Sequence, residues 1–246
     1  LVRERALRLY HLANDIRVTP TQFARVNELY EDCLSILDIE GRPELFIAQN
    51  PLVNAGAVGV DRPFIVLHSG TLGLLTDDEL RFVLGHEIGH ILSDHVLYKT
   101  MLHLVMRMTV LRFGAPIAPL ALIGIVAALS EWDRKSELSA DRAGMLCVQD
   151  PKVVYTVHMK MAGGNKPEQM DVDEFVRQAE DYERDGSLVD GVFKFLNLMW
   201  RTHPFHVLRL VELKRWVDSG AYQKVVDGEY TKRDDDDGAS VYAEVK

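Results

Sequence analysis

The chain has 246 residues, of which 47% are hydrophobic and 26% charged, and these are ordinary values for a globular protein. This length fits one domain with appendages and allows a sizeable hydrophobic core. The net charge of −9 argues against nucleic acid as a partner, because phosphate binding needs clustered lysine and arginine.

The chain contains two cysteines, Cys33 and Cys147, and each lies in an apolar helical pattern, so we expect buried free thiols. No zinc-finger spacing is present, and any metal must therefore be held by histidine and carboxylate. The N-terminus is charged and lacks a signal-peptide core. The last segment, residues 221–246, is polar and acidic and is expected to be a solvated tail.

The N-terminal part of the chain, residues 1–40, is predicted to be helical. Thr19 and Gln22 have the spacing of a capping box, with proline at the first helical position, and the helix they open should end near Gly41. Three short apolar runs follow, and turn residues separate them. They predict strands over residues 44–49, 52–60 and 64–68.

A second capping box, Thr76 to Glu79, predicts a helix that runs to about Lys99 or beyond. After it, residues 113–129 contain no charged side chain, and two prolines interrupt them. This stretch is interpreted as a buried helical hairpin, and the alternative is a segment at or in a membrane surface.

The rest of the chain is predicted to be mostly helical. The expected helices cover residues 130–148, 151–163, 189–200 and 203–217, with a polar segment at 165–186. No repeat and no alternation of strands with helices is visible, so the fold class is α+β with helices dominant. The main domain is expected to cover residues 41–220.

The pattern with the clearest chemistry is His86-Glu87-Ile88-Gly89-His90 on the second capped helix. Two histidines four residues apart share one helical face, so both imidazoles can reach one Zn²⁺ ion. Glu87 points to a neighbouring face, where it can act as a base beside the metal. Gly85 and Gly89 are small enough to let a substrate or another helix approach closely.

A catalytic zinc ion needs a third protein ligand. Asp94 and His95 follow on the same helix, about 6 Å or more along its axis from His90, which is too far for the same ion, and His203 is a further candidate. Glu137 is favoured because Asp141, one turn later, can orient a ligand imidazole. The alternative is that both carboxylates pair with nearby basic residues on a solvated face, and the residues alone do not decide between these two readings.

The chain resembles the HtpX-like and type I CAAX-prenyl-protease family of gluzincin zinc peptidases. The likeness lies in the His-Glu-x-x-His helix, in Glu137-Leu138-Ser139-Ala140-Asp141, and in Thr202-His203-Pro204 followed by Arg209. With Asn54-Ala55 on an upstream strand, it extends over roughly residues 40 to 215. The resemblance implies a gluzincin-type domain that holds one Zn²⁺ ion through His86, His90 and Glu137.

The resemblance also suggests roles for the remaining residues in the hydrolysis of peptide bonds. Glu87 is expected to be the general base, and His203 to donate a hydrogen bond to the developing oxyanion. Arg209 is expected to neutralise Glu137 or Asp141. Asn54 and Ala55 are expected to lie on an edge strand that binds a protein or peptide substrate by backbone pairing.

Two functions from other classes stay open at this point. One is a zinc protein without proteolytic activity, whose closed site supports binding of a partner. The other is an adaptor on a membrane surface, which would use residues 113–129 for peripheral association. The expected location is accordingly cytoplasmic or membrane-associated, and the sequence does not indicate an oligomeric state.

Overall fold

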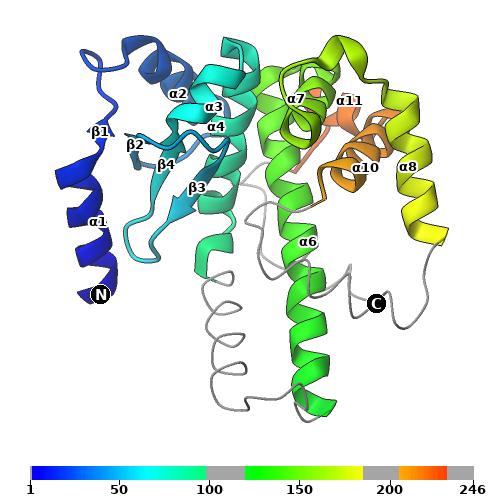
Figure 1. The fold of residues 1–246 in the computed structure, drawn as a ribbon, viewed down its shortest axis with the longest axis horizontal. Coiled ribbons are helices and arrows are strands. Elements are labelled where there is room, and N and C mark those ends of the chain that lie inside the picture. The colour runs from blue at the N-terminus through cyan, green and yellow to red at the C-terminus, as the bar shows by residue number, and fades with distance from the viewer. Residues whose placement is uncertain (1, 98–119, 185–204, 232–246) are drawn as a thin grey trace.

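The structure is a computed structural model and describes residues 2–97, 120–184 and 205–231 (Figure 1). It confirms an α+β fold that is predominantly helical, with a small sheet ahead of the histidine-bearing helix. In chain order the elements are α1 (Val2–Asn14), β1 (Ile16–Arg17), α2 (Ala24–Ile36), β2 (Glu44–Ala48), β3 (Ala55–Val58), β4 (Phe64–His68), α3 (Ser69–Leu74), α4 (Asp77–Leu92), α6 (Leu120–Val148), α7 (Pro151–Gly163), the 3₁₀ helix η1 (Pro167–Gln169), α8 (Val172–Arg184), α10 (His206–Asp218) and α11 (Ala221–Val226).

The sheet has four strands in the order β1-β2-β4-β3. β2 and β4 run parallel, and β1 and β3 pair antiparallel at the two edges. The predicted strands correspond to β2, β3 and β4, although β3 is shorter than expected. β1 was not predicted, and through it the N-terminal segment joins the sheet.

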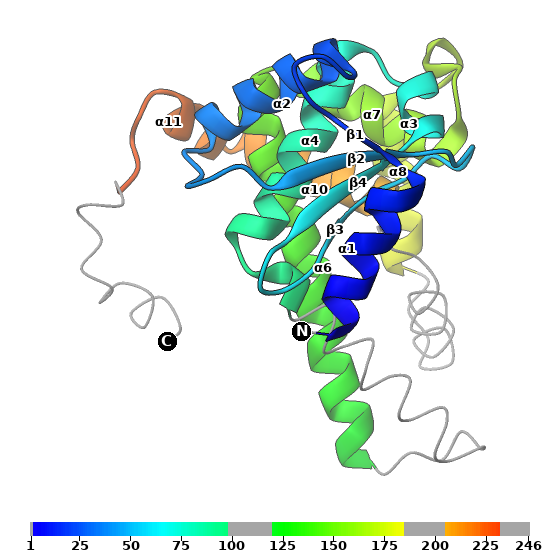
Figure 2. The same ribbon diagram turned by 90° about the vertical axis from the view of Figure 1, so that its left-hand side faces the viewer.

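Alternating side chains of the sheet face two different layers. Leu45 and Ile47 point into the main core beneath α2 and α4, whereas Phe46 and Phe64 form a second buried cluster on the opposite face. Helix α1 lies against that opposite face (Figure 2), and its His11 ring meets Phe64 edge-on with centroids 5.4 Å apart. The small sheet is therefore covered on both sides.

Glu4 on α1 fastens the turn between β3 and β4. Its carboxylate accepts hydrogen bonds from the backbone amides of Val60, Asp61 and Arg62 at 3.2, 3.4 and 2.9 Å. Gly59 precedes them with φ 96°, and a Cβ atom there would lie 2.8 Å from Glu4 Oε1. Glycine at this position therefore permits both the turn and the close approach of α1.

The N-terminus of α4 is closed by the predicted capping box, which the structure confirms. Thr76 Oγ1 accepts from the Glu79 amide at 3.4 Å, and Glu79 Oε2 accepts from the Thr76 amide at 2.8 Å. Lys160 of α7 also donates to Glu79 Oε2 at 2.7 Å, which ties the start of α4 to the helical half of the molecule.

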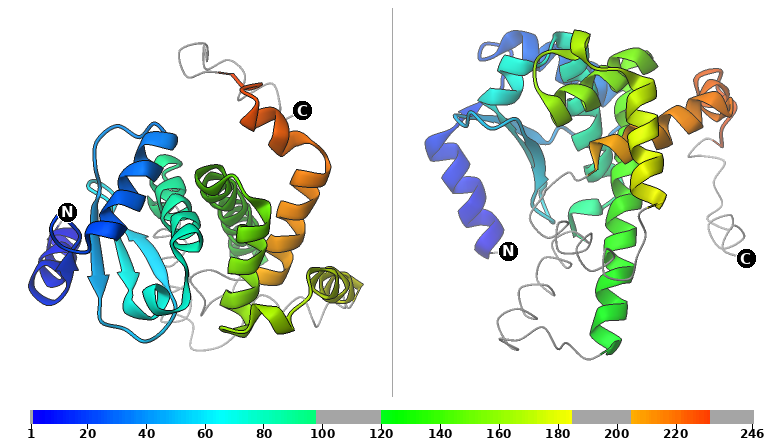
Figure 3. Two further views of the ribbon diagram at one scale, coloured as in Figure 1. Left: turned by 90° about the horizontal axis from the view of Figure 1, so that it is seen from above. Right: turned by 45° about the vertical axis from the view of Figure 1, so that its right-hand side comes forward.

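Helices α4 and α6 pack directly against each other at the middle of the molecule (Figure 3, left). The sheet with α1 and α2 lies on one side of this pair, and α7, α8, α10 and α11 lie on the other. A Cβ atom on Gly89 would lie 2.8 Å from Ala143 Cβ and 3.2 Å from Ala140 Cα. Gly89, inside the His86–His90 motif, therefore allows α6 to approach α4 closely.

Several predicted boundaries are wrong. Thr19 Oγ1 does accept from the Gln22 amide at 3.0 Å, but Phe23 has φ 53°, and α2 begins only at Ala24. Helix α4 ends at Leu92 instead of near residue 99. Helix α11 lies in the predicted tail, and the two cysteines are buried and free as predicted.

The apolar stretch at residues 113–129 lies partly outside the described residues, and the expected helix at 189–200 lies entirely outside them. From Leu120 onward the stretch belongs to α6, which therefore starts earlier than predicted. Within the described parts of the chain, no helix combines the length and the apolar character needed to span a bilayer.

Candidate metal centre

Two histidines of α4 and one glutamate of α6 bring their ligand atoms together. His86 Nε2 lies 3.1 Å from His90 Nε2 and 3.6 Å from Glu137 Oε2, and His90 Nε2 lies 3.3 Å from Glu137 Oε1. All three side chains are buried. The histidines share one face of α4, and the close packing of α6 places Glu137 opposite them. This group can hold a metal ion.

Asp141 sets the orientation of the first histidine. Its Oδ1 atom accepts a hydrogen bond from His86 Nδ1 at 2.9 Å. Because an ionised carboxylate only accepts, the imidazole proton lies on Nδ1, and the lone pair of Nε2 faces Glu137. Asp141 follows Glu137 by one helical turn, so the same face of α6 supplies both carboxylates.

Arg209, in the first turns of α10, joins the two carboxylates of α6. Its Nε donates to Asp141 Oδ2 at 2.7 Å and its Nη2 to Oδ1 at 2.5 Å, while Nη1 lies 3.0 Å from Glu137 Oε2. Burial lowers the pKa of Arg209, but the charges of Asp141 and Glu137 outweigh burial and raise it. Burial raises the pKa of Asp141, but Arg209 outweighs it and holds that pKa well below its usual range.

His95 touches the second histidine from a turn beyond the end of α4. The Nδ1 atoms of His90 and His95 lie 3.0 Å apart, and His95 is buried. His95 is not among the three candidate ligands, but it lies closer to His90 than a continuous helix would place it, because Asp94 adopts φ 52° and turns the chain. His95 meets the outer nitrogen of His90, on the side away from Glu137.

Glu87 faces the sheet. Its Oε2 atom accepts a hydrogen bond from the backbone amide of Ala57 on β3 at 2.8 Å, and its side chain is buried. Because this amide points away from β4, the backbone groups of Ala55, two residues earlier, point to the same side. Glu87 therefore lies between the histidine pair and the edge of the sheet.

Charged and titratable side chains are concentrated at this centre. Three buried carboxylates, Glu87, Glu137 and Asp141, lie near the buried guanidinium of Arg209 and the imidazoles of His86 and His90. His158 adds no charge to this group, because burial lowers its pKa to about 3 and keeps it neutral at physiological pH. Imidazole nitrogens and a carboxylate are ligands that divalent cations such as Zn²⁺ accept, so this set of side chains suits a divalent cation.

A cavity of about 30 Å³ adjoins Glu87 and the edge strand. His158 contributes to it, with Nε2 3.7 Å from Asp141 Oδ2 and Nδ1 3.4 Å from His206 Nδ1. The cavity is lined both by His86 and by Ala55 of β3. Its lining residues are Ala55, Phe82, Val83, His86, Glu87, Val157, His158, Met161, His206 and Arg209.

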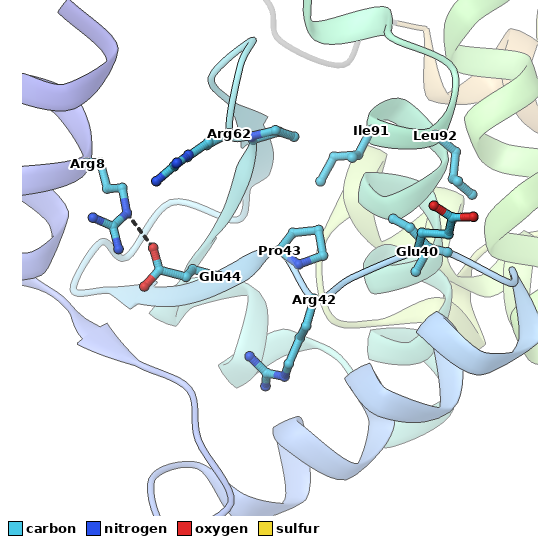
Figure 4. Close-up of a pocket in the computed structure, with 10 residues that line it drawn as sticks. Arg8, Glu40, Arg42, Pro43, Glu44, Arg62, Ile91 and Leu92 are labelled. Carbon is cyan, nitrogen blue, oxygen red and sulfur yellow. Dashed lines mark hydrogen bonds and ion pairs between the residues drawn. The ribbon is translucent and has the colours of Figure 1, made fainter. Parts of the chain in front are cut away.

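A larger hollow of about 800 Å³ lies between α1, the start of β2 and the end of α4 (Figure 4). We call it the charged hollow. Its ionic side chains are at least partly exposed, and Arg8 pairs with Glu44 at 2.5 Å. It contains neither the histidine pair nor the carboxylates and the arginine that surround it. It is lined by Arg8, Ile39, Glu40, Arg42, Pro43, Glu44, Arg62, Pro63, Ile91 and Leu92.

The structure thus brings together His86, Glu87, His90, Glu137, Asp141 and Arg209, which we call the metal centre. Ala55 lines the adjoining cavity, and the Asn54 carbonyl pairs with the His68 amide at 3.0 Å at the start of β3. His203 lies outside the described residues. Sequence reasoning assigned no role to His158 and placed His95 too far from His90. The His90–His95 spacing separates the two rings on a continuous helix, so it does not reveal the contact that the turn at Asp94 creates.

A His-Glu-x-x-His helix facing a glutamate from a later helix is the arrangement of a gluzincin-type metallopeptidase. The chain belongs to peptidase family M48, whose model matches residues 20–217. This finding confirms the family resemblance seen in the sequence.

Curated relatives agree with this assignment. The chain is 34% identical to "Plastoglobule-localized metallopeptidase 48, chloroplastic" of Arabidopsis thaliana over 91% of its own length and 65% of the relative. It is 30% identical to "Mitochondrial metalloendopeptidase OMA1" of Arabidopsis thaliana over 48% of its own length and 25% of the relative. It is 26% identical to "Protease HtpX homolog" of Tropheryma whipplei (strain Twist) over 51% of its own length and 52% of the relative. The chain thus spans 65% or less of each of these relatives.

Proposed function

We propose that the chain is a zinc-dependent endopeptidase whose single Zn²⁺ ion is held by His86, His90 and Glu137. The observation that carries this proposal is the spacing of the candidate ligand atoms: the two Nε2 atoms lie 3.1 Å apart, His90 Nε2 lies 3.3 Å from Glu137 Oε1, and His86 Nε2 lies 3.6 Å from Glu137 Oε2. Ligands at about 2.0–2.1 Å from a tetrahedral ion are about 3.3 Å apart, so the spacing suits zinc. The three side chains are buried, and imidazole and carboxylate groups are the ligands that zinc binds, which supports the proposal as well.

The chemistry follows from the position of Glu87. When bound, Zn²⁺ lowers the pKa of a water molecule and polarises the scissile carbonyl group. Glu87 accepts the proton of the attacking water and then delivers it to the leaving amine. The hydrogen bond from the Ala57 amide keeps the Glu87 carboxylate turned toward the cavity next to the histidine pair.

The substrate is proposed to be a protein or peptide that adds to the edge of the sheet. β3 is the last strand on that side among the described strands, and the Ala55 side chain lines the cavity beside Glu87. An extended peptide placed along Asn54 and Ala55 brings a peptide bond close to Glu87. His203 remains a predicted donor to the oxyanion.

A closed structural zinc site is less well supported. Such a site would need a fourth protein ligand, which Asp141 or His203 would have to supply. Asp141 instead binds the outer nitrogen of His86 and the guanidinium of Arg209. Peripheral membrane contact through residues 113–129 stays a prediction, and so does a cytoplasmic or membrane-associated location.

The test of this proposal is Glu87→Gln, which keeps the size of the side chain and removes the base. Hydrolysis of casein should fall about 10²–10⁴-fold. Zinc content should stay at one ion per chain, because Glu87 is not among the proposed ligands. Glu168→Gln, at an exposed glutamate, serves as the matched control and should keep full activity.

Two results would contradict the proposal. If Glu87→Gln cleaves casein as fast as the unchanged chain, Glu87 is not the general base. If the unchanged chain keeps its activity after a chelator has removed the metal, the hydrolysis does not depend on zinc.

A further inference from the structure

The turn after α4 places a histidine where helical geometry alone would not. A helix that continued to residue 95 would carry His95 about 7.5 Å along the axis from His90. Instead Asp94 adopts φ 52°, and its amide donates to the Ile91 carbonyl at 3.2 Å. The chain is helical again over residues 95–97, and His95 Nδ1 lies 3.0 Å from His90 Nδ1.

The direction of this contact follows from metal binding. His90 Nε2 faces His86 Nε2 and Glu137 Oε1, so it must offer a lone pair to hold an ion between them. The proton of His90 then lies on Nδ1 and is donated to His95 Nδ1. His95 must carry its own proton on Nε2. Each ligand imidazole thus has its own acceptor, Asp141 for His86 and His95 for His90.

His95 is itself fixed by packing against α6. Its ring meets the Trp132 ring edge-on, with centroids 5.4 Å apart and an interplanar angle of 82°. His95 is only 7% exposed. Trp132 lies on the same helix as Glu137, so the acceptor for His90 and the third ligand are positioned by one element.

We infer that His95 is a positioning residue for the metal, which holds the His90 imidazole in the orientation and tautomer that binding requires. This inference rests on the proposed zinc site. Loss of an outer partner of a ligand histidine typically weakens metal binding about 10–100-fold. Loss of the His95 acceptor should therefore weaken zinc affinity without removing any ligand.

The experiment measures the dissociation constant for zinc by competition with a chromogenic chelator, in the purified chain and three variants. His95→Phe keeps a ring against Trp132 but has no acceptor. His95→Asn loses the ring but places its carbonyl oxygen near the position of Nδ1. His95→Gln places the same oxygen one methylene further out. Phe and Gln should weaken binding about 10–100-fold, and Asn by less than about threefold.

The outcomes separate the inference from the proposed function. If His95→Phe binds zinc as the unchanged chain does, or if Asn and Gln weaken binding equally, the inference is overturned. Should His95→Phe fail to fold, the difference between Asn and Gln still decides. Failure of the unchanged chain to bind zinc overturns the proposed function, and the inference falls with it.

Discussion

The metal centre and the charged hollow are both concave and both rich in ionic side chains, but they differ in burial. At the metal centre the side chains of Arg209 and Asp141 are 5% and 0% exposed. In the charged hollow those of Arg8 and Glu44 are 41% and 24% exposed. The two ion pairs have the same N···O distance of 2.5 Å. Distance alone therefore says little about what a pair contributes.

Burial determines what each ion pair does. In the charged hollow, water can replace either partner, so the geometry is loosely held and the pair adds little stability. At the metal centre no water replaces a lost partner, and removing one charge leaves the other uncompensated. The buried pair therefore fixes His86 and Glu137 in place, whereas the exposed pair has no comparable effect on its surroundings.

The largest expected effect is that of Arg209→Met. This change leaves Asp141 and Glu137 buried without their guanidinium, and it should lower the free energy of unfolding by about 3–5 kcal/mol. Urea denaturation of the metal-free chain measures it. A loss below about 1 kcal/mol would show that the buried network is no more important than a surface pair.

A smaller effect is expected from His158, which lies beside Asp141. Burial lowers its pKa to about 3, whereas in the unfolded chain it takes up a proton near the ordinary value of 6.5. The unfolded state therefore binds more protons between these values, and stability should fall as the pH drops below 6.5. Down to pH 4.5 this amounts to at most about 2–3 kcal/mol.

His158→Phe should flatten that part of the stability profile, which melting temperatures across the pH range would show. His68→Phe is a suitable control, because His68 lies at the end of β4 and contacts the Leu52 carbonyl at 3.2 Å. An identical slope in the chain with and without His158 would refute the assignment.

The smallest effect is expected for Arg8→Met, the counterpart of the Arg209 change. It removes the exposed pair with Glu44 and should cost no more than about 1 kcal/mol, with less at high salt. The same urea measurement applies. A cost as large as that of Arg209→Met would remove the distinction between the charged hollow and the metal centre.

Local signals in the sequence were sufficient for much of the fold. The Thr76 capping box was predicted because all of its atoms belong to four consecutive residues. Strands β2 and β4 were predicted because buried strands in the middle of a sheet are continuous apolar runs. β1 was missed because two exposed residues, Ile16 and Arg17, form no periodic pattern.

The end of α4 could not be predicted from the same signals. Leu92-Ser93-Asp94-His95 contains neither glycine nor proline, and only the tolerance of aspartate for positive φ permits the turn at Asp94. The position of His95 depends on that single dihedral angle. Spacing indicated His86 and His90, and the family resemblance indicated Glu137. Neither indicated a role for His95, which reaches the centre only through a break in the helix.

The positions of Asp141 and Arg209 are tertiary information. Spacing along α6 suggested that Asp141 follows Glu137 on one face, and the family resemblance suggested Arg209. Neither indicated that one guanidinium would bind both carboxylates, because α6 and α10 are far apart in the sequence. That arrangement depends on the packing of α10 against α6.

Glu4 shows that the structural unit around the metal centre extends upstream of the family match. The family match starts at residue 20, but the carboxylate that fastens the turn after β3 belongs to α1. β3 leads from that turn back to Ala57, whose amide holds Glu87. A fragment trimmed to the family boundary would keep every proposed ligand and lose the hydrogen bonds from the turn to Glu4. Such a fragment is better regarded as truncated than as minimal.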